Sequence, residues 1–225
     1  MPVNNLAPIA KKQRPGTAAY ANGQITAANI LQTAKRIVID DGMSQLTLRR
    51  IAREMDMSPG NLSYYYATKN DLMEDLFMHV LAPFLAEFER LRKLRADSPE
   101  AQLRAVLNFV FDDLATRETT MFFPEMWVMA LRDAWAAEKM ERVYHTYRSV
   151  LVDIIAAMRP DLDARTHDDL ALTLSASVEG HTVFVGHGRS HQSRAAFVKP
   201  LIVEQLVKLV SQAGKKPAKQ TAAAS

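Results

Sequence analysis

The side chains best suited to contact a partner lie within residues 58–69. Asn61 and Ser63 carry polar groups that can hydrogen-bond to the edges of bases. Tyr64 and Tyr65 can contact a phosphate, a sugar or the methyl group of thymine. The chemistry that these residues indicate is recognition of DNA.

Two short helices joined by a tight turn are predicted to position these residues. Thr47 can cap the first helix, and a turn follows at Asp56, because aspartate tolerates the left-handed backbone conformation better than most residues. Ser58 and Pro59 then begin the second helix, Ser58 as its N-cap and Pro59 at its first position. The second helix has few apolar residues and a polar, aromatic outer face, which suits a DNA groove. The segment is therefore interpreted as a DNA-binding helix-turn-helix.

The same run resembles the DNA-binding domain of the TetR family of bacterial transcriptional regulators, over about residues 25–80. The sequence departs from the family's pattern at Asp56, Ser63 and Tyr66, where glycine, tyrosine and phenylalanine are usual. The positions that match the pattern are Thr47, Ile51, Ala52, Met57, Ser58, Gly60, Leu62, Lys69 and Leu72. With Arg49 and Lys69 placed on the phosphate backbone, the residues expected to contact DNA are Thr47, Arg49, Ser58, Gly60, Asn61, Ser63, Tyr64, Tyr65 and Lys69.

The composition excludes several other kinds of site. The chain of 225 residues has no cysteine, which excludes disulfides, thiolate nucleophiles and cysteine-ligated metals. No apolar run approaches the roughly 20 residues of a membrane span, and the N-terminus has no continuous hydrophobic signal segment. We therefore expect a cytoplasmic protein without a membrane partner.

Charge is distributed unevenly along the chain. Residues 1–69 contain 9 lysine and arginine residues against 4 aspartate and glutamate residues, whereas residues 70–212 contain 16 against 21. A basic N-terminal segment followed by an acidic remainder fits a chain that presents its N-terminal part to DNA, because neutralisation of phosphates supplies much of the affinity for DNA.

Helical periodicity predicts an all-α chain in four parts. Residues 1–24 are expected to form a disordered basic arm and residues 213–225 a disordered tail. Residues 25–70 form the three-helix, helix-turn-helix DNA-binding domain, and residues 71–212 form a helical domain that the resemblance assigns to ligand binding and dimerisation. Apart from the helix-turn-helix, helices are expected at about 25–41, 70–95, 98–117, 121–137, 138–158, 163–187 and 193–212.

Pro83 falls inside the long helix predicted at about 70–95. A proline inside a helix removes one backbone hydrogen bond and bends the helix. Two interpretations stay open: a fixed bend that fits the packing, or a hinge through which the body moves the DNA-binding domain.

Residues 121–135 are rich in methionine and aromatic side chains. In the family's fold such helices enclose a pocket for a small inducer, and these side chains suit an adaptable, largely apolar one. The alternative is a packed helical core. The residues expected to line the pocket, with Asn108 as the polar group, are Asn108, Phe111, Phe123, Trp127, Tyr144, Tyr147 and His181.

A metal site or an enzyme is not expected. His181, His187 and His191 are close in sequence, but Gly186 and Gly188 are predicted to break the helix between the last two histidines. The sequence contains no G-x-S-x-G motif and no glycine-rich phosphate loop. No cofactor is expected, and a carboxylate–histidine pair assembled from distant helices is the remaining enzymatic alternative.

Taken together, the helix-turn-helix and the family resemblance predict a homodimeric transcriptional repressor that binds a palindromic operator and is released by a small ligand. The helices expected at about 163–187 and 193–212 carry long apolar stripes and small residues, and the family resemblance implies that this pair from each of two copies forms a four-helix interface. A monomer that buries the same stripes internally is the alternative. One alternative is a constitutive or activating regulator without an inducer. Another is a helical module that has lost DNA binding, against which Gly60 and Lys69 argue.

Overall fold

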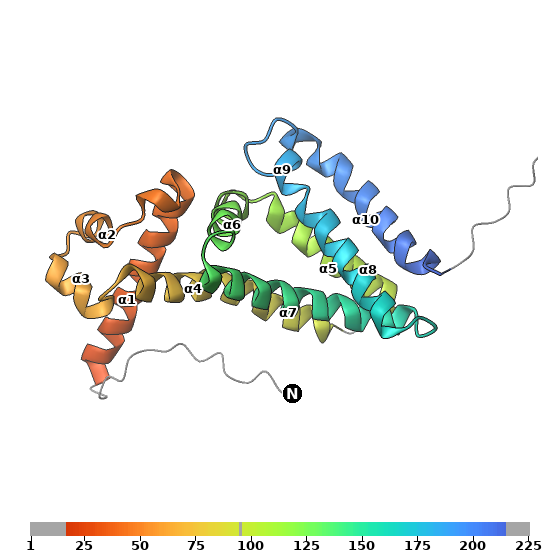
Figure 1. Cartoon of the computed structure of the whole chain (residues 1–225), viewed down its shortest axis with the longest axis horizontal. Helices are drawn as coiled ribbons and strands as arrows, with labels where there is room; N and C mark the ends of the chain where they lie inside the picture. Colours follow the sequence, from red (N-terminus) through yellow and green to blue (C-terminus); the bar gives the residue numbers. More distant parts are fainter. Residues whose placement is uncertain (1–16, 95, 215–225) are drawn as a thin grey trace, which may run out of the picture. The chain divides into compact units, whose positions relative to one another are not determined.

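Figure 1 shows the computed structural model of the chain, which describes residues 17–94 and 96–214. All regular elements of these residues are helices, so the predicted all-α fold is confirmed. The α-helices are α1 (Thr17–Asp41), α2 (Leu48–Glu54), α3 (Pro59–Tyr65), α4 (Lys69–Arg92), α5 (Pro99–Leu114), α6 (Arg117–Ala130), α7 (Ala134–Met158), α8 (Ala164–Glu179), α9 (Thr182–Val185) and α10 (Ala195–Gln212). Two short 3-10 helices are η1 (Met43–Gln45) and η2 (Gln192–Arg194).

Packing divides the chain into two compact units. Of the described residues, the first unit comprises 17–87 and 117–143, and the second comprises 88–94, 96–116 and 144–214. The boundaries fall within α4, between α5 and α6, and within α7. The first unit thus extends beyond residue 70, the boundary drawn from the sequence, because it includes most of α4, all of α6 and the start of α7.

The first unit is built around α1, α2, α3 and the first turns of α4. Gly42 follows the last residue of α1 with a φ of +87°, a conformation that glycine adopts without the strain of a side chain. Apolar side chains from these segments are buried together and hold α2 and α3 in place. They include Ile30, Ala34, Ile37, Leu46, Ile51, Leu62, Leu72 and Leu76.

The helix-turn-helix has the predicted caps and turn. The Thr47 hydroxyl oxygen accepts a hydrogen bond from the backbone N–H of Arg50 at 3.1 Å. The Ser58 hydroxyl oxygen accepts one from the backbone N–H of Asn61 at 3.2 Å. Asp56 between them has a φ of +52°, the left-handed conformation expected at the turn.

Helix α6 is joined to the end of α1 by polar contacts within the first unit. α1 and α6 pack directly against each other. The contacts are an ion pair between Lys35 and Glu118 at 3.0 Å, an ion pair between Arg117 and Asp40 at 2.6 Å, and a hydrogen bond from the backbone N–H of Met43 to the Glu125 carboxylate at 3.2 Å.

In the second unit, α5 packs against both α8 and α10. Arg104 on α5 forms an ion pair with Glu204 on α10 at 2.8 Å. The Arg159 guanidinium donates hydrogen bonds to the carbonyl oxygens of Val210 and Ser211, which satisfies free acceptors at the end of α10. The buried side chains of this unit include Leu103, Leu107, Val150, Leu151, Ile155, Leu174 and Val178.

Helix α1 begins at Thr17 rather than near Ile25, so residues 17–24 are helical and the predicted disorder of this stretch is wrong. The stretch contains several alanines, which have the highest helix propensity, and the single Gly23 costs only about 1 kcal/mol relative to alanine. The remainder of the expected arm, residues 1–16, and most of the expected tail, residues 215–225, lie outside the described residues.

The boundary predicted at residues 137–138 lies elsewhere, because α6 ends at Ala130 and α7 begins at Ala134. α6 also begins earlier than expected, at Arg117. The Asp133 carboxylate accepts hydrogen bonds from the backbone N–H groups of Trp135 and Ala136 at 2.9 and 3.2 Å, which caps the start of α7. No glycine or proline marks this turn, so periodicity alone placed it too late.

The helix predicted at 163–187 ends earlier, because α8 stops at Glu179 and is followed by the short α9. Gly180 has low helix propensity. The backbone N–H of His181 then bonds to the carbonyl of Val178, three residues back instead of four, which tightens the chain into a turn.

Candidate DNA-binding surface and ligand pocket

The outer face of α3 carries the polar and aromatic side chains that the sequence predicted to contact DNA. Asn61 and Ser63 are exposed, Tyr65 is half-buried, and 69% of the Tyr64 surface is exposed. The Tyr64 and Tyr65 rings meet edge to face, with their centroids 5.4 Å apart. Leu62 on the opposite face is buried and anchors the helix.

Tyr66 packs inward. Its side chain is buried, and its hydroxyl donates a hydrogen bond to the Asp75 carboxylate at 3.1 Å. Burial, together with the charge of Asp75 and this hydrogen bond, raises the pKa of Tyr66. Burial also raises the pKa of Asp75. Tyr66 is therefore a structural residue that fixes the end of α3 against α4.

Hydrogen bonds inside α3 limit what Ser63 can offer to a base. Its hydroxyl donates to the carbonyl oxygen of Pro59 at 2.9 Å, so the oxygen remains available only as an acceptor. The Asn61 side chain keeps both a donor and an acceptor, so it can form hydrogen bonds with a base edge that Ser63 cannot form.

The basic residues near α3 fall into two groups. Arg36 and Arg50 are engaged within the unit, because both pair with Glu54 and Arg50 also pairs with Asp41 at 2.6 Å. Arg49 and Lys69 are exposed and form no ion pair with any residue that the structure describes. The cations free to neutralise phosphates thus include the two that the sequence placed on the DNA backbone, together with Arg53 on α2, which is exposed and forms no ion pair with the described residues.

The start of α4 has a reciprocal cap that the sequence reasoning did not single out. The Thr68 hydroxyl oxygen accepts from the backbone N–H of Asp71, and the Asp71 carboxylate accepts from the backbone N–H of Thr68, both at 3.1 Å. The signal for this capping box is a threonine followed three residues later by an acid. Because Asp71 already complements the positive helix terminus, Lys69 would contact a phosphate through its side chain alone.

The seven residues expected to line a ligand pocket are divided between the two units. Phe123 and Trp127 belong to the first unit, where Phe123 is buried and meets Phe84 edge to face at 5.5 Å. The other five belong to the second unit: Asn108, Phe111, Tyr144, Tyr147 and His181.

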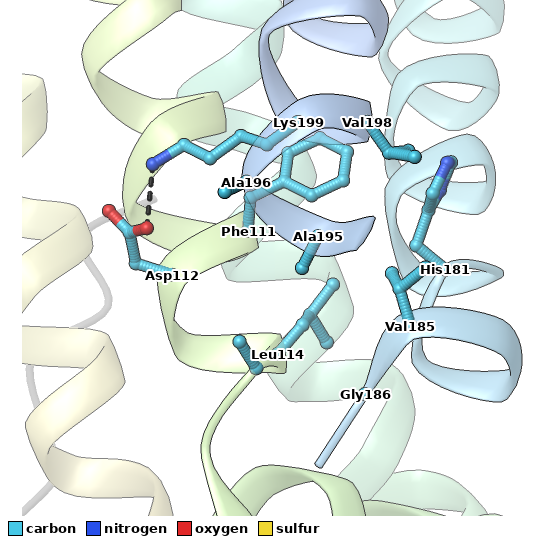
Figure 2. Close-up of a pocket in the computed structure, with 11 residues that line it drawn as sticks. Phe111, Asp112, Leu114, His181, Val185, Gly186, Ala195, Ala196, Val198 and Lys199 are labelled. Carbon is cyan, nitrogen blue, oxygen red and sulfur yellow. Dashed lines mark hydrogen bonds and ion pairs between the residues drawn. The ribbon is translucent and has the colours of Figure 1, made fainter. Parts of the chain in front are cut away.

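A pocket of about 220 Å³ brings two of these five residues together. Figure 2 shows it between α5, α9 and the start of α10, with Phe111 and His181 among its lining residues. The Phe111 and His181 rings are 5.1 Å apart and close to perpendicular. The remaining lining residues are Asp112, Leu114, Ala115, Val185, Gly186, Ala195, Ala196, Val198 and Lys199.

The pocket is mostly apolar, with a few polar groups. The Lys199 ammonium forms an ion pair with the Asp112 carboxylate at 2.6 Å (Figure 2). His181 Nδ1 lies 2.6 Å from the carbonyl oxygen of Ser177. A carbonyl only accepts hydrogen bonds, so Nδ1 carries the proton and a neutral His181 keeps Nε2 as an acceptor.

Tyr144 and Tyr147 do not line this pocket. Tyr147 is buried and stacks on Phe88, with the ring centroids 5.0 Å apart. Tyr144 is half-buried, and its hydroxyl bonds to the carboxylate of Glu179 on α8. The sequence reasoning missed Glu179, because an acid near the end of an amphipathic helix looks like an ordinary surface residue.

Within residues 17–94 and 96–214, no group of three or more histidine, aspartate or glutamate side chains is arranged to hold a metal ion. No helix of the same residues is long and apolar enough to cross a membrane.

Two family models match the chain. The model described as bacterial regulatory proteins of the tetR family matches residues 30–76, which contain the helix-turn-helix. The model described as the C-terminal part of BetI-type transcriptional repressors matches residues 99–218.

Known proteins and solved structures resemble the chain as well. The HTH-type transcriptional regulator BetI of Burkholderia thailandensis is 27% identical over 162 residues, covering 70% of this chain and 80% of that protein. BetI of Burkholderia mallei is 33% identical over 90 residues, covering 40% of this chain and 46% of that protein. A transcriptional regulator from Saccharomonospora viridis, solved in complex with choline, is 17% identical with a TM-score of 0.66, covering 84% of this chain and 97% of that one. GusR from Salmonella enterica is 20% identical with a TM-score of 0.65, covering 83% and 94%. The chain therefore belongs to the TetR family of bacterial transcriptional regulators, with a C-terminal part of the BetI type.

Proposed function

We propose that this DNA-binding regulator is a repressor that binds a palindromic operator as a homodimer and is released by a small, largely apolar ligand. The observation that carries the proposal is the outer face of α3. Asn61, Ser63 and Tyr64 are exposed there, while Leu62 and Tyr66 are buried behind them. A rigid helix that presents hydrogen-bonding and aromatic groups to solvent is suited to the major groove.

The exposed apolar surface of the last helices supports a dimer. Large apolar side chains that remain exposed in one copy mark surfaces that associate with a partner. TetR-family regulators act as dimers, and a second copy would cover this surface by pairing α8 and α10 of both chains. The exposed residues are Leu172 on α8, Val183 and Phe184 on α9, and Phe197, Leu201 and Leu209 on α10.

The second unit supports the ligand-responsive part of the proposal. It contains the pocket next to Phe111 and His181, and the separate cluster around Tyr144 and Tyr147. A ligand bound there releases DNA only if it binds more tightly to a conformation whose two α3 helices no longer match the operator.

The experiment is transcription in vitro from a promoter that carries a DNA site selected by the protein itself. The proposal predicts that the purified protein lowers transcript yield, and that a promoter with a scrambled site is unaffected. An increase in transcript would make the protein an activator and would contradict the proposed sign of regulation.

A further inference from the structure

The pocket between α5, α9 and the start of α10 has a largely apolar wall. Phe111 and Leu114 of α5 are buried beside it, and Val185 of α9 and Val198 of α10 are half-buried. Its volume is about 220 Å³. A dry apolar cavity of about 150 Å³ is already large enough to bind benzene. The size and the lining of this pocket therefore fit a small molecule with an apolar body.

The charged groups at the pocket compensate each other. The Lys199 ammonium and the Asp112 carboxylate form an ion pair at 2.6 Å. Figure 2 shows this pair on one side of the pocket, with His181 and Val185 on the other side. An ion that entered the apolar space would find no unpaired opposite charge, and burial of an unpaired charge is costly. The pocket therefore favours a neutral ligand over an anion or a cation.

His181 provides an acceptor for a hydrogen bond from such a ligand. Its Nδ1 donates to the carbonyl oxygen of Ser177 at 2.6 Å, so Nε2 of the neutral ring is an acceptor. No described residue donates a hydrogen bond to Nε2. The contact with the Phe111 ring, at 5.1 Å between centroids, also holds the His181 ring in place. A ligand with one donor group would satisfy this acceptor.

The two rings at the pocket also favour an aromatic ligand. Aromatic rings in contact prefer edge-to-face or offset-stacked arrangements. The Phe111 and His181 rings are close to perpendicular, so together they offer both an edge and a face to a third ring. A phenol combines this ring with a neutral hydroxyl donor, whereas a carboxylate of similar size brings a charge and has no donor.

We propose that this pocket is a binding site for a small neutral phenol, whose hydroxyl donates to Nε2 of His181 and whose ring lies against Phe111 and Leu114. This inference rests on the proposed function, because it names the chemical class of the ligand that releases the DNA.

The same helices that line the pocket also carry the surface proposed to contact a second copy. On α9, Val185 lines the pocket and the neighbouring Phe184 is exposed. On α10, Val198 lines the pocket and the neighbouring Phe197 is exposed. A bound phenol would therefore fix the positions of α9 and the start of α10, and with them one part of the proposed dimer surface. This is how an occupied pocket would alter the spacing of the two α3 helices.

Calorimetric titration of the full-length protein with phenol at neutral pH tests the proposal without a mutation. Toluene has nearly the same size but no hydroxyl, and benzoate and benzylammonium carry opposite charges. We expect saturable phenol binding, with toluene weaker by about threefold or more because one hydrogen bond is lost. Both ions should bind more weakly than toluene. Absence of saturable phenol binding, equal affinity for toluene, or tighter binding of either ion would overturn the proposal.

His181→Phe removes the acceptor and keeps an aromatic ring. Phenol affinity should fall to that of toluene while toluene affinity stays the same, whereas a purely structural role of His181 would lower both. His145→Phe is the matched control, because His145 is exposed on α7 and should leave both affinities unchanged. A folded His181→Phe protein that still prefers phenol would refute the role of Nε2.

Ala195→Phe fills the pocket and tests its location independently of His181. Ala195 is half-buried in the pocket wall, so a benzyl group there should abolish saturable binding of phenol and of toluene. Ala157→Phe, at an exposed position on α7, is the control and should bind both as the wild type does. Thermal unfolding checks that the variants fold. Undiminished binding by folded Ala195→Phe would place the phenol elsewhere and overturn the assignment.

DNA binding measured on the same preparations separates this inference from the proposed function. Sequence-selective DNA binding without saturable phenol binding would refute the phenol site and leave the proposed repressor function intact. Phenol binding by a protein that binds no DNA sequence selectively would refute the proposed function instead. If both hold, saturating phenol should weaken operator binding, and unchanged operator binding would refute the link between this pocket and release of the DNA.

Discussion

Asn61 is the residue whose loss should change sequence preference most. It is exposed on α3 and keeps both donor and acceptor groups for a base edge. Asn61→Ala should cost about 1–3 kcal/mol on the preferred site and much less on a site changed at the contacted base pair. Competition binding with single-substitution operators measures this. An equal loss on every sequence would show that Asn61 contacts only the DNA backbone.

Lys69 should act through charge and not through sequence. It is exposed at the first position of α4 and has no ion pair among the described residues. Lys69→Ala should weaken binding to all sequences and flatten the slope of log affinity against log salt by about one unit. Lys93→Ala removes another exposed lysine, one that follows α4 in the second unit, and should leave the slope unchanged. A slope that Lys69→Ala does not alter would exclude the phosphate contact.

At the scale of single residues, the sequence identified the side chains on the surface of α3 but not Glu179. The N-caps Thr47 and Ser58 and the turn at Asp56 depend on a few neighbouring residues, and all three were predicted correctly. The surroundings of Glu179 include a hydrogen bond from Tyr144 and the negative charge of Asp113, and both residues come from other helices. Contacts between residues so far apart in sequence leave no local pattern.

At the scale of elements, the junction between α1 and α6 should depend on Gly42. Its φ of +87° strains any other residue, and an added Cβ would lie 3.2 Å from the Glu125 carboxylate that binds the neighbouring Met43 amide. Gly42→Ala should therefore destabilise the protein by about 1–2 kcal/mol. Denaturant unfolding provides the measurement.

Gly23→Ala is the matched control for this prediction. Gly23 lies inside α1, and an added Cβ there would meet nothing within 4 Å. Alanine inside a helix should stabilise the protein by about 0.5–1 kcal/mol. Equal effects of the two substitutions would show that the backbone conformation at Gly42 does not matter.

Helix boundaries were predictable where a local signal marks them. The helix expected from about residue 98 begins there as α5, where the Ser98 hydroxyl accepts a hydrogen bond from the backbone N–H of Ala101 at 3.1 Å and Pro99 is the first helical residue. The turn before α7 depends on Asp133 alone and was placed too late. The attachment of α6 to α1 joins segments about 80 residues apart, so periodicity could not reveal that the first unit contains both helices.

At the scale of the whole molecule, a charge on α10 should disrupt the proposed dimer. Leu201 is 51% exposed in the surface proposed to be covered by a second copy. Leu201→Glu should yield monomers. It should also weaken binding to a palindrome far more than to a half-site, because two DNA-binding domains joined in one dimer bind the second half-site at a higher effective concentration. Analytical ultracentrifugation and binding to both DNAs test this.

Val128→Glu is the control for the dimer prediction. Val128 is 56% exposed on α6, in the first unit and outside the proposed dimer surface, so the variant should remain dimeric. A dimeric Leu201→Glu protein would place the contact between copies elsewhere.

The most direct test of the central claim is selection of bound fragments from random DNA by the purified full-length protein. If α3 reads bases in a symmetric dimer, the enriched fragments should contain a palindrome. Its half-sites should lie on one face of the duplex, with centres about one helical turn, or 10 base pairs, apart or at a multiple of that spacing. Enrichment of no sequence, with binding that depends only on salt, would contradict sequence-specific recognition by α3.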